Sequence, residues 1–104
     1  MKQLTVIVNE ALEEVKGENI ITLDVTDITA VMDTVIVVSG STSRQVKALS
    51  NAVIEASKKA GFQPLGVEGM DGGEWVLVDL IDVVVHIMQP AVRNDVATSQ
   101  ANSG

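Results

Sequence analysis

The apolar residues of this chain recur at helical spacing in two stretches. Over residues 4–16 they return every three or four positions, with glutamates opposite them, which predicts an amphipathic helix that ends at Gly17. A second helix is predicted from Thr42, because Thr42 and Gln45 have the spacing of a capping box, to Gly61. The apolar stripe of this second helix consists of Val46, Leu49, Val53 and Ala56.

Five other stretches are rich in β-branched and apolar residues and predict strands. They lie at residues 20–25, at 34–39, near Pro64, at 75–79 and at 82–88. The run at 34–39 is apolar almost throughout, which predicts a strand covered on both faces. We expect the strand–helix–strand unit that ends near Pro64 to form a parallel pair, and the last two strands to form an antiparallel hairpin.

The order of these elements, helix–strand–strand–helix–strand–strand–strand, predicts a single α/β (α+β) domain. We expect a small mixed β-sheet of about five strands, packed by two to three helices. A length of 104 residues suits one hydrophobic core, and we assign the domain to residues 1–92. Residues 93–104 are mostly small and polar and are expected to form a disordered or frayed tail, after a helical turn or two following Pro90.

The composition narrows the classes of partner. Fourteen acidic residues against 7 basic ones give a net charge of −7, which disfavours binding to a nucleic-acid backbone and favours a basic protein partner. The alternative is that the negative surface only keeps the domain soluble. No apolar run approaches the roughly 18–20 residues of a membrane span, and the N-terminal stretch does not resemble a signal or transit peptide. We therefore expect a cytoplasmic location.

Catalytic and metal-binding chemistry finds little support in the sequence. Ser41 or Ser43 could pair with His86, but both serines suit the cap of the second helix, and no G-x-S-x-G motif occurs. With one His and no Cys, a metal site would depend almost entirely on carboxylates, and neither glycine-rich phosphate-binding motif occurs. We expect no catalytic residue, no metal site and no cofactor.

The stretch from Gln63 to Gln89 carries a family pattern. It matches PLGxEG, a variable loop and WxxxDxxDVxVHxM, and through it the chain resembles the ribosomal silencing factors, also called Iojap-like proteins, over roughly residues 4–90. The matching residues are Pro64, Leu65, Gly66, Val67, Glu68, Gly69, Trp75, Asp79, Asp82, Val83, Val85, His86 and Met88, preceded by Asp33 and by Gly40, Ser41, Thr42, Ser43 and Arg44.

The resemblance implies a ribosomal silencing factor and not an enzyme. Such proteins bind the large ribosomal subunit through the ribosomal protein uL-fourteen and sterically block subunit association, which represses translation under nutrient limitation. The resemblance also implies a nucleotidyltransferase-like scaffold without catalytic carboxylates, since no Asp-x-Asp occurs here. Two alternatives stay open: a small nucleotidyltransferase-like enzyme that uses Gly40 and Ser41 to bind nucleotide, and a homodimerisation module.

The candidate contact surface lies on the matching residues, and several of them have a second interpretation. His86 could be a half-buried residue bonded to a neighbouring carboxylate, and Trp75 could be core instead of surface. The two aspartates beside the hairpin turn could serve only the turn, and Arg44 is expected to pair with Asp33 or another nearby carboxylate. The candidate partner-binding residues are Trp75, Asp79, Leu80, Asp82 and His86, with Thr42, Ser43 and Arg44.

Two features depart from the family pattern. Ile81 occupies the position in the hairpin turn where the family most often has Gly, so the turn either keeps a negative φ or stores strain. After Arg93 the chain lacks the Tyr, the Trp and the acidic and Leu residues that the family's C-terminal helix usually carries. What that helix contributes elsewhere is therefore in question for this chain.

Overall fold

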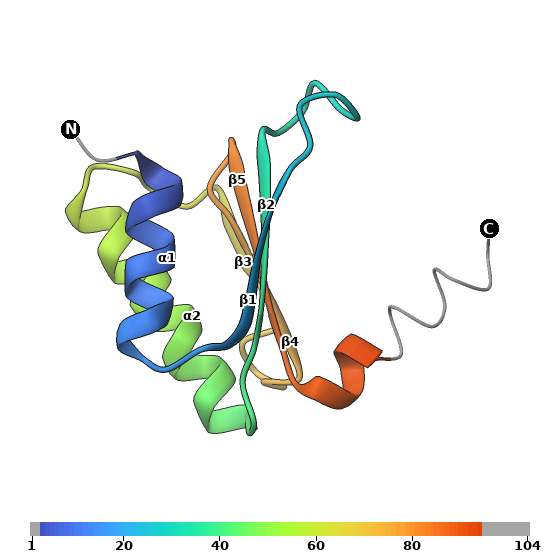
Figure 1. Ribbon diagram of the computed structural model, residues 1–104. Coiled ribbons are helices and arrows are strands. Elements are labelled where there is room, and N and C mark those ends of the chain that lie inside the picture. The colour runs from blue at the N-terminus through green and yellow to red at the C-terminus, as the bar shows by residue number, and fades with distance from the viewer. Residues whose placement is uncertain (1–2, 95–104) are drawn as a thin grey trace.

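The computed structural model describes residues 3–94 and contains a five-stranded sheet with two long helices on one side (Figure 1). Residues 90–94 add a short helical turn after the last strand. The observed order confirms the predicted one. The elements are α1 (Leu4–Glu14), β1 (Glu18–Asp24), β2 (Thr34–Ser39), α2 (Ser43–Lys59), β3 (Gly66–Glu68), β4 (Trp75–Asp79) and β5 (Val83–Met88).

The strands follow the order β1-β2-β5-β4-β3 across the sheet. Only β2 and β5 are parallel, while β1 with β2, β5 with β4 and β4 with β3 are antiparallel. The predicted hairpin of the last two strands is confirmed, but the strand near Pro64 is not the parallel neighbour of β2. The hairpin lies between them, and β5, in the central position of the sheet, is buried along nearly its whole length.

The end of α1 differs in detail from the prediction. Lys16, not Gly17, adopts the left-handed conformation, with φ 61°. The Gly17 amide donates to the Leu12 carbonyl at 2.8 Å and closes the last turn of the helix. Gly17 is needed for a different reason: a Cβ there would lie 2.7 Å from the Val38 side chain of β2. The small residue lets the chain pass closely over the sheet.

The start of α2 confirms one half of the predicted capping box. The Thr42 hydroxyl accepts a hydrogen bond from the Gln45 amide at 3.1 Å. The Gln45 side chain does not return to Thr42 but donates to the Val15 carbonyl at 2.6 Å. It thereby ties the start of α2 to the end of α1.

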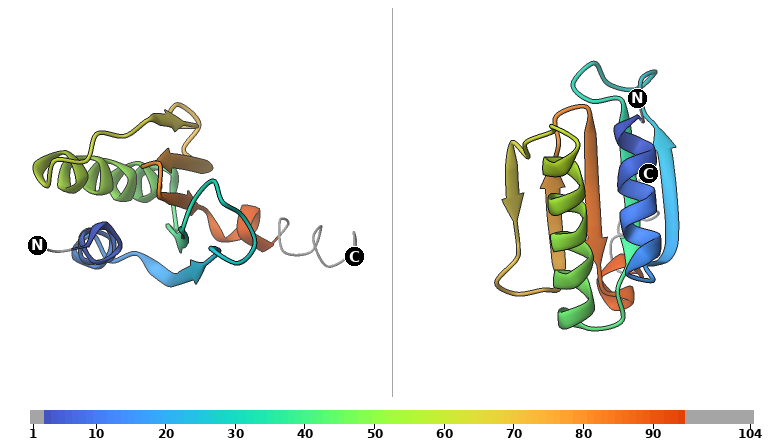
Figure 2. Two further views of the ribbon diagram at one scale, coloured as in Figure 1. Left: turned by 90° about the horizontal axis from the view of Figure 1, so that it is seen from above. Right: turned by 90° about the vertical axis from the view of Figure 1, so that its left-hand side faces the viewer.

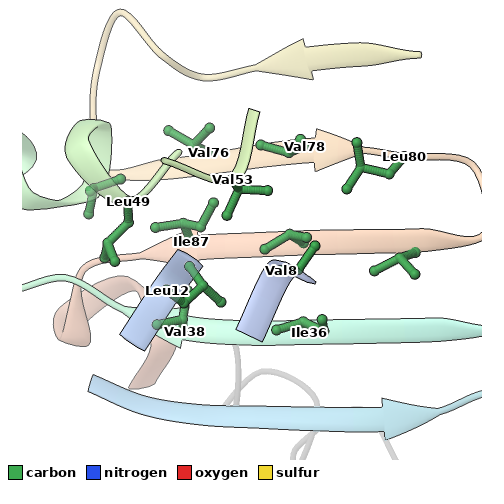
Figure 3. Packing of buried hydrophobic residues seen from close by; sticks show 13 residues of the cluster. Val8, Leu12, Ile36, Val38, Leu49, Val53, Val76, Val78, Leu80 and Ile87 are labelled. Carbon is green, nitrogen blue, oxygen red and sulfur yellow. The ribbon is translucent and has the colours of Figure 1, made fainter. Parts of the chain in front are cut away.

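The hydrophobic core lies between the two helices and the sheet (Figure 3). Val8 and Leu12 of α1 and Leu49 and Val53 of α2 point toward the alternate residues of the strands that face them. Most of the predicted stripe of α2 is buried, but Ser57 is buried beside it and Ala56 is only half-buried. The strand residues of this core are Ile36, Val38, Val76, Val78, Val83, Val85 and Ile87, joined by Leu80 of the hairpin turn.

The predicted cover on both faces of residues 34–39 holds only at the end of the strand, where Val38 and Ser39 are both buried. Ile36 and Val38 are fully buried under the helices, but Val35 and Val37 are only half-buried on the opposite side. Both views in Figure 2 place α1 and α2 on the same side of the sheet. We call the sheet side opposite these two helices the open face.

Candidate functional site

The strand registers determine which residues share the open face. Residues that pair across neighbouring strands point to the same side of a sheet, so each register position extends as a row across it. The middle row is Ile21, Val37, His86, Leu77 and Glu68. The rows on either side are Ser39, Met88 and Trp75, and Leu23, Val35, Val84, Asp79 and Gly66.

Most of these rows are apolar, and several of their side chains are accessible. Ile21 is 46% exposed, Leu23 is 48% exposed and Trp75 is 41% exposed. The acidic members, Glu68 and Asp79, lie toward the β3–β4 side of the face. Ser39, Val84 and Met88 in the middle of the face are buried, so the accessible apolar area lies on β1 and at Trp75. Exposed large apolar side chains of this kind, next to acidic residues, are typical of an interaction site.

Trp75 and His86 form a pair on this face. The Trp75 indole Nε1–H donates a hydrogen bond to Nδ1 of His86 at 3.1 Å. The ring centroids lie 5.9 Å apart, with the planes tilted by 51°. Trp75 is thus a surface residue, and His86 is half-buried as expected, but its partner is the indole and not a carboxylate.

The direction of this hydrogen bond defines the state of the imidazole. An indole N–H can only donate, so Nδ1 of His86 must carry a free lone pair and the ring must be neutral. Burial lowers the pKa of His86 below its ordinary value of 6.5, because desolvation penalises the charged imidazolium. The pair is therefore formed at neutral pH.

The loop before Trp75 is held by close backbone contacts. Gly69 has φ +88°, and a Cβ there would overlap the Trp75 carbonyl oxygen. The Gln89 side-chain amide donates to the Gly73 carbonyl at 3.1 Å and to the Ser43 hydroxyl at 3.0 Å. Gln89 therefore fastens this loop to the start of α2 and helps to fix the base of Trp75.

The hairpin turn at the other end of β4 uses its aspartates structurally. A carboxylate oxygen of Asp79 accepts from the Ile81 amide at 2.8 Å, as the turn-only interpretation of this residue expects. The backbone carbonyl of Asp82 accepts from the amides of Asp33 and Thr34 and joins the turn to the start of β2. Leu80 is only 4% exposed, so its expected contact with a partner is not compatible with its burial.

The candidate residues divide between the two ends of β4. Thr42 and Ser43 lie beside the loop that precedes Trp75, where the first caps α2 and the second accepts from Gln89. Arg44 is exposed at the start of α2. Its expected pairing with Asp33 does not occur in the described part of the chain, because the two residues flank opposite ends of β2.

Several residues of the open face are absent from the sequence-based candidates. Leu77 could have been found, because it shares the two-residue alternation of Trp75 and Asp79 along β4. Ile21, Leu23 and Val37 join the face only through the pairing of β1 with β2 and of β2 with β5. No local pattern marks Gln89, whose role depends on two distant segments.

The hydrogen bonds of Ser43 and His86 also bear on the catalytic alternative. Ser43 is bonded to Gln89 and Nδ1 of His86 is bonded to Trp75, so these two residues do not form a nucleophile–base pair. Within residues 3–94, no group of three or more His, Cys, Asp or Glu side chains is arranged to hold a metal ion. None of the helices in this range is long and apolar enough to cross a membrane.

The chain is thus an α+β protein with two long helices on one side of its sheet and a partly accessible, mostly apolar face on the other. A family model described as "Ribosomal silencing factor during starvation" matches residues 1–98. The chain belongs to the ribosomal silencing factor family. This membership confirms the resemblance carried by the motif around Trp75 and His86, and it makes the protein a ribosome-associated regulator of translation.

Individual relatives agree with the family assignment. Ribosomal silencing factor RsfS of Chromobacterium violaceum is 48% identical over 94 residues, which cover 90% of this chain and 77% of the relative. RsfS of Haemophilus influenzae is 40% identical over 84 residues, covering 81% and 82%, and RsfS of Bacillus subtilis is 33% identical over 93 residues, covering 89% and 79%.

Solved structures confirm the fold. A crystal structure from Chromobacterium violaceum superposes with a TM-score of 0.90 at 46% identity, covering 97% of this chain and 84% of that one. A crystal structure from Bacillus halodurans gives a TM-score of 0.81 at 28% identity and covers 88% of both chains.

Proposed function

We propose that this protein binds the large ribosomal subunit through the ribosomal protein uL-fourteen and sterically blocks subunit association. Translation would thereby be repressed under nutrient limitation. The proposal extends the family assignment, and the observation that carries it is the exposed Trp75 on the open face. Binding and bulk are sufficient for this mechanism, so we infer that the protein is not an enzyme and uses no cofactor.

The character of the open face supports a basic protein as its partner. Ile21, Leu23 and Trp75 offer accessible apolar area, while Glu68 and Asp79 lie at its margin. No Lys or Arg occurs between Lys59 and Arg93, so β3, β4, β5 and their loops carry only negative charge apart from the neutral His86. Ribosomal proteins are mostly basic, and complementary charge would favour docking and orient it.

The contact surface that we propose is centred on Trp75 and His86. Asp79 and Asp82 extend it at the hairpin turn, and Thr42, Ser43 and Arg44 extend it at the opposite end of β4. Leu80 supports the turn from inside the core and is left out. We assign the binding unit to the domain at residues 1–92 and its place of action to the cytoplasm, where ribosomal subunits join.

Sedimentation through a sucrose gradient tests the proposal. The protein is mixed with purified large subunits, and small subunits are then added. We expect the protein to co-migrate with the large subunit and the fraction of joined particles to fall. Protein that stays at the top of the gradient while the subunits join normally would contradict the proposal.

Replacement of Trp75 tests the centre of the surface. Trp75→Ala removes an accessible aromatic side chain from the open face, and we expect a loss of about 2 kcal/mol in binding to the large subunit, typical of an interface hot spot. The fold should be retained, since Trp75 lies outside the buried core. Affinity is measured by titration of labelled protein with large subunits, and folding by circular dichroism. An unchanged affinity would exclude Trp75 as an anchor.

A homodimer formed through the edge of the sheet is the competing hypothesis. The exposed Ile21 and Leu23 lie on the edge strand β1, which could pair with a second copy. Sedimentation equilibrium of the free protein measures this association. If large subunits convert a dimer to bound monomers, the two partners use one surface; if the dimer binds intact, they use different surfaces.

A further inference from the structure

The chain contains one Trp and one His, and the fold places them against each other on the open face. They come from neighbouring strands: Trp75 begins β4, and His86 lies two residues before its cross-strand partner Met88 on β5. Such diagonal neighbours are within reach of aromatic side chains. The surface Trp is thus oriented by a hydrogen bond from its edge and not by packing in the core.

This hydrogen bond depends on the protonation state of His86. Nδ1 accepts the hydrogen bond from the indole N–H with its only lone pair, which lies in the ring plane. A protonated imidazole has no acceptor left. Uptake of one proton would place two N–H groups against each other. The bond is then lost, and the two donors repel.

The pKa of His86 is governed by burial and not by a neighbouring charge. Burial is the cause of its lowered pKa, so the imidazole is neutral at neutral pH. Strand β2 contributes only Val35, Val37 and Ser39 to the open face. The charged groups nearest in the rows are Asp79 on β4, Glu68 on β3, Glu18 opposite Ser39 on β1, and Arg93, which donates to Ser39 at 2.7 Å.

We propose that His86 is the positioning residue of Trp75: its unprotonated Nδ1 holds the indole in the orientation that docks, and proton uptake by His86 releases the indole and weakens docking. The release of the indole is a property of the free protein. The effect on docking rests on the proposed function, so the two parts are measured separately.

The free protein tests the release without any partner. Because Trp75 is the one indole of the chain, both its fluorescence and its single indole N–H signal in a nitrogen-edited NMR spectrum report on this pair alone. We expect both signals to change together in one transition with a midpoint below pH 6.5, matching the titration of the His86 ring. A flat indole signal while the His86 ring titrates would overturn the proposal.

Two substitutions separate the hydrogen bond from the bulk of the side chain. His86→Asn puts an amide oxygen, which does not titrate, in the place of Nδ1, while His86→Leu removes the acceptor. We expect His86→Asn to keep the bonded N–H signal at every pH, and His86→Leu to show the released signal at every pH. Circular dichroism checks that both variants are folded. A pH transition that survives in His86→Asn would mean that another group controls Trp75.

Binding to large subunits tests the second part. Between about pH 7.5 and a pH below the midpoint of the indole transition, we expect the wild-type affinity to fall by about three- to tenfold, the range that one lost hydrogen bond supplies. His86→Asn should lose less, and it serves as the control for any change in the ribosome itself. An equal loss in both proteins overturns the coupling. No binding at any pH overturns the proposed function and the coupling together, while the spectroscopic result on the release of Trp75 still stands.

Discussion

At the scale of single residues, the hairpin turn contains a strained position. Ile81 has φ 76°, in the left-handed region that a β-branched residue rarely adopts and that costs about 1–2 kcal/mol. The Asp79 carboxylate accepts from the Ile81 amide at 2.8 Å and partly offsets this cost. The sequence left open whether the turn keeps a negative φ or stores strain, and the positive φ of Ile81 shows that it stores strain. The side chain is 55% exposed, so little packing compensates for it.

Relief of this strain is measurable. Ile81→Asn introduces a residue that tolerates the left-handed region, without the additional unfolded-state entropy of Gly, and we expect the free energy of unfolding to rise by about 1 kcal/mol. Ile81→Val keeps the branched Cβ and should give no gain. Urea denaturation of the three proteins measures the difference. Lower stability of Ile81→Asn would show that contacts of the Ile81 side chain outweigh the strain.

At the scale of elements, the contact of α1 with β2 sets how closely the helix layer approaches the sheet. Gly17 lies where the chain leaves α1, and added atoms there would meet both the Val38 side chain and the Leu12 carbonyl. Both of these residues are fully buried. A side chain at this point would push apart two elements that share the core.

Gly17→Ala tests this contact. The new Cβ would lie 2.7 Å from Val38, and we expect a loss of about 1–3 kcal/mol in the free energy of unfolding, the usual cost of overpacking. Gly66→Ala is the matched control, since a Cβ at Gly66 meets nothing within 4 Å and should be nearly neutral. Thermal and urea unfolding compare the two variants. Equal stability of both would mean that α1 shifts without cost.

Residues 34–39 form the predicted strand, but the prediction that both of its faces are covered holds only in part. An apolar residue favours a strand equally whether its side chain faces the helices or the opposite side of the sheet. Val35 and Val37 are as apolar as Ile36 and Val38, yet they lie on the open face. Apolar strand residues that lie outside the core thus indicate an interaction surface. The sequence does not distinguish them from core residues, because the position of the helices decides which side of the strand is buried.

At the scale of the whole molecule, acidic residues occur on both sides of the sheet. The net charge of −7 includes acids on α1 as well as acids around β3, β4 and the hairpin turn. Attraction between the protein and a basic partner depends on the distance of each charge from the contact and is screened within about 8–10 Å at physiological salt. The position of an acid should therefore matter more than the total charge.

Two substitutions of equal charge test this expectation. Asp82→Asn changes an exposed acid at the hairpin turn of the proposed surface, whereas Glu13→Gln changes an exposed acid on α1, across the sheet from the open face. We expect Asp82→Asn to slow association with large subunits several-fold at low salt and Glu13→Gln to have little effect, with the difference shrinking at about 0.5 M salt. Stopped-flow association rates measure both. An equal effect of the two substitutions would assign the attraction to net charge alone.

The order of helices and strands, the Thr42 cap, the β4–β5 hairpin and the family motif were all predictable from the sequence, because each depends on residues that are close along the chain. The sequence also marked Trp75 and His86 as unusual in an apolar frame. The tertiary structure decided that β5 lies between β2 and β4, that one sheet face is open, and that Trp75 donates to His86. These features depend on strand order, register and helix placement, which join distant residues and leave no pattern in any single segment.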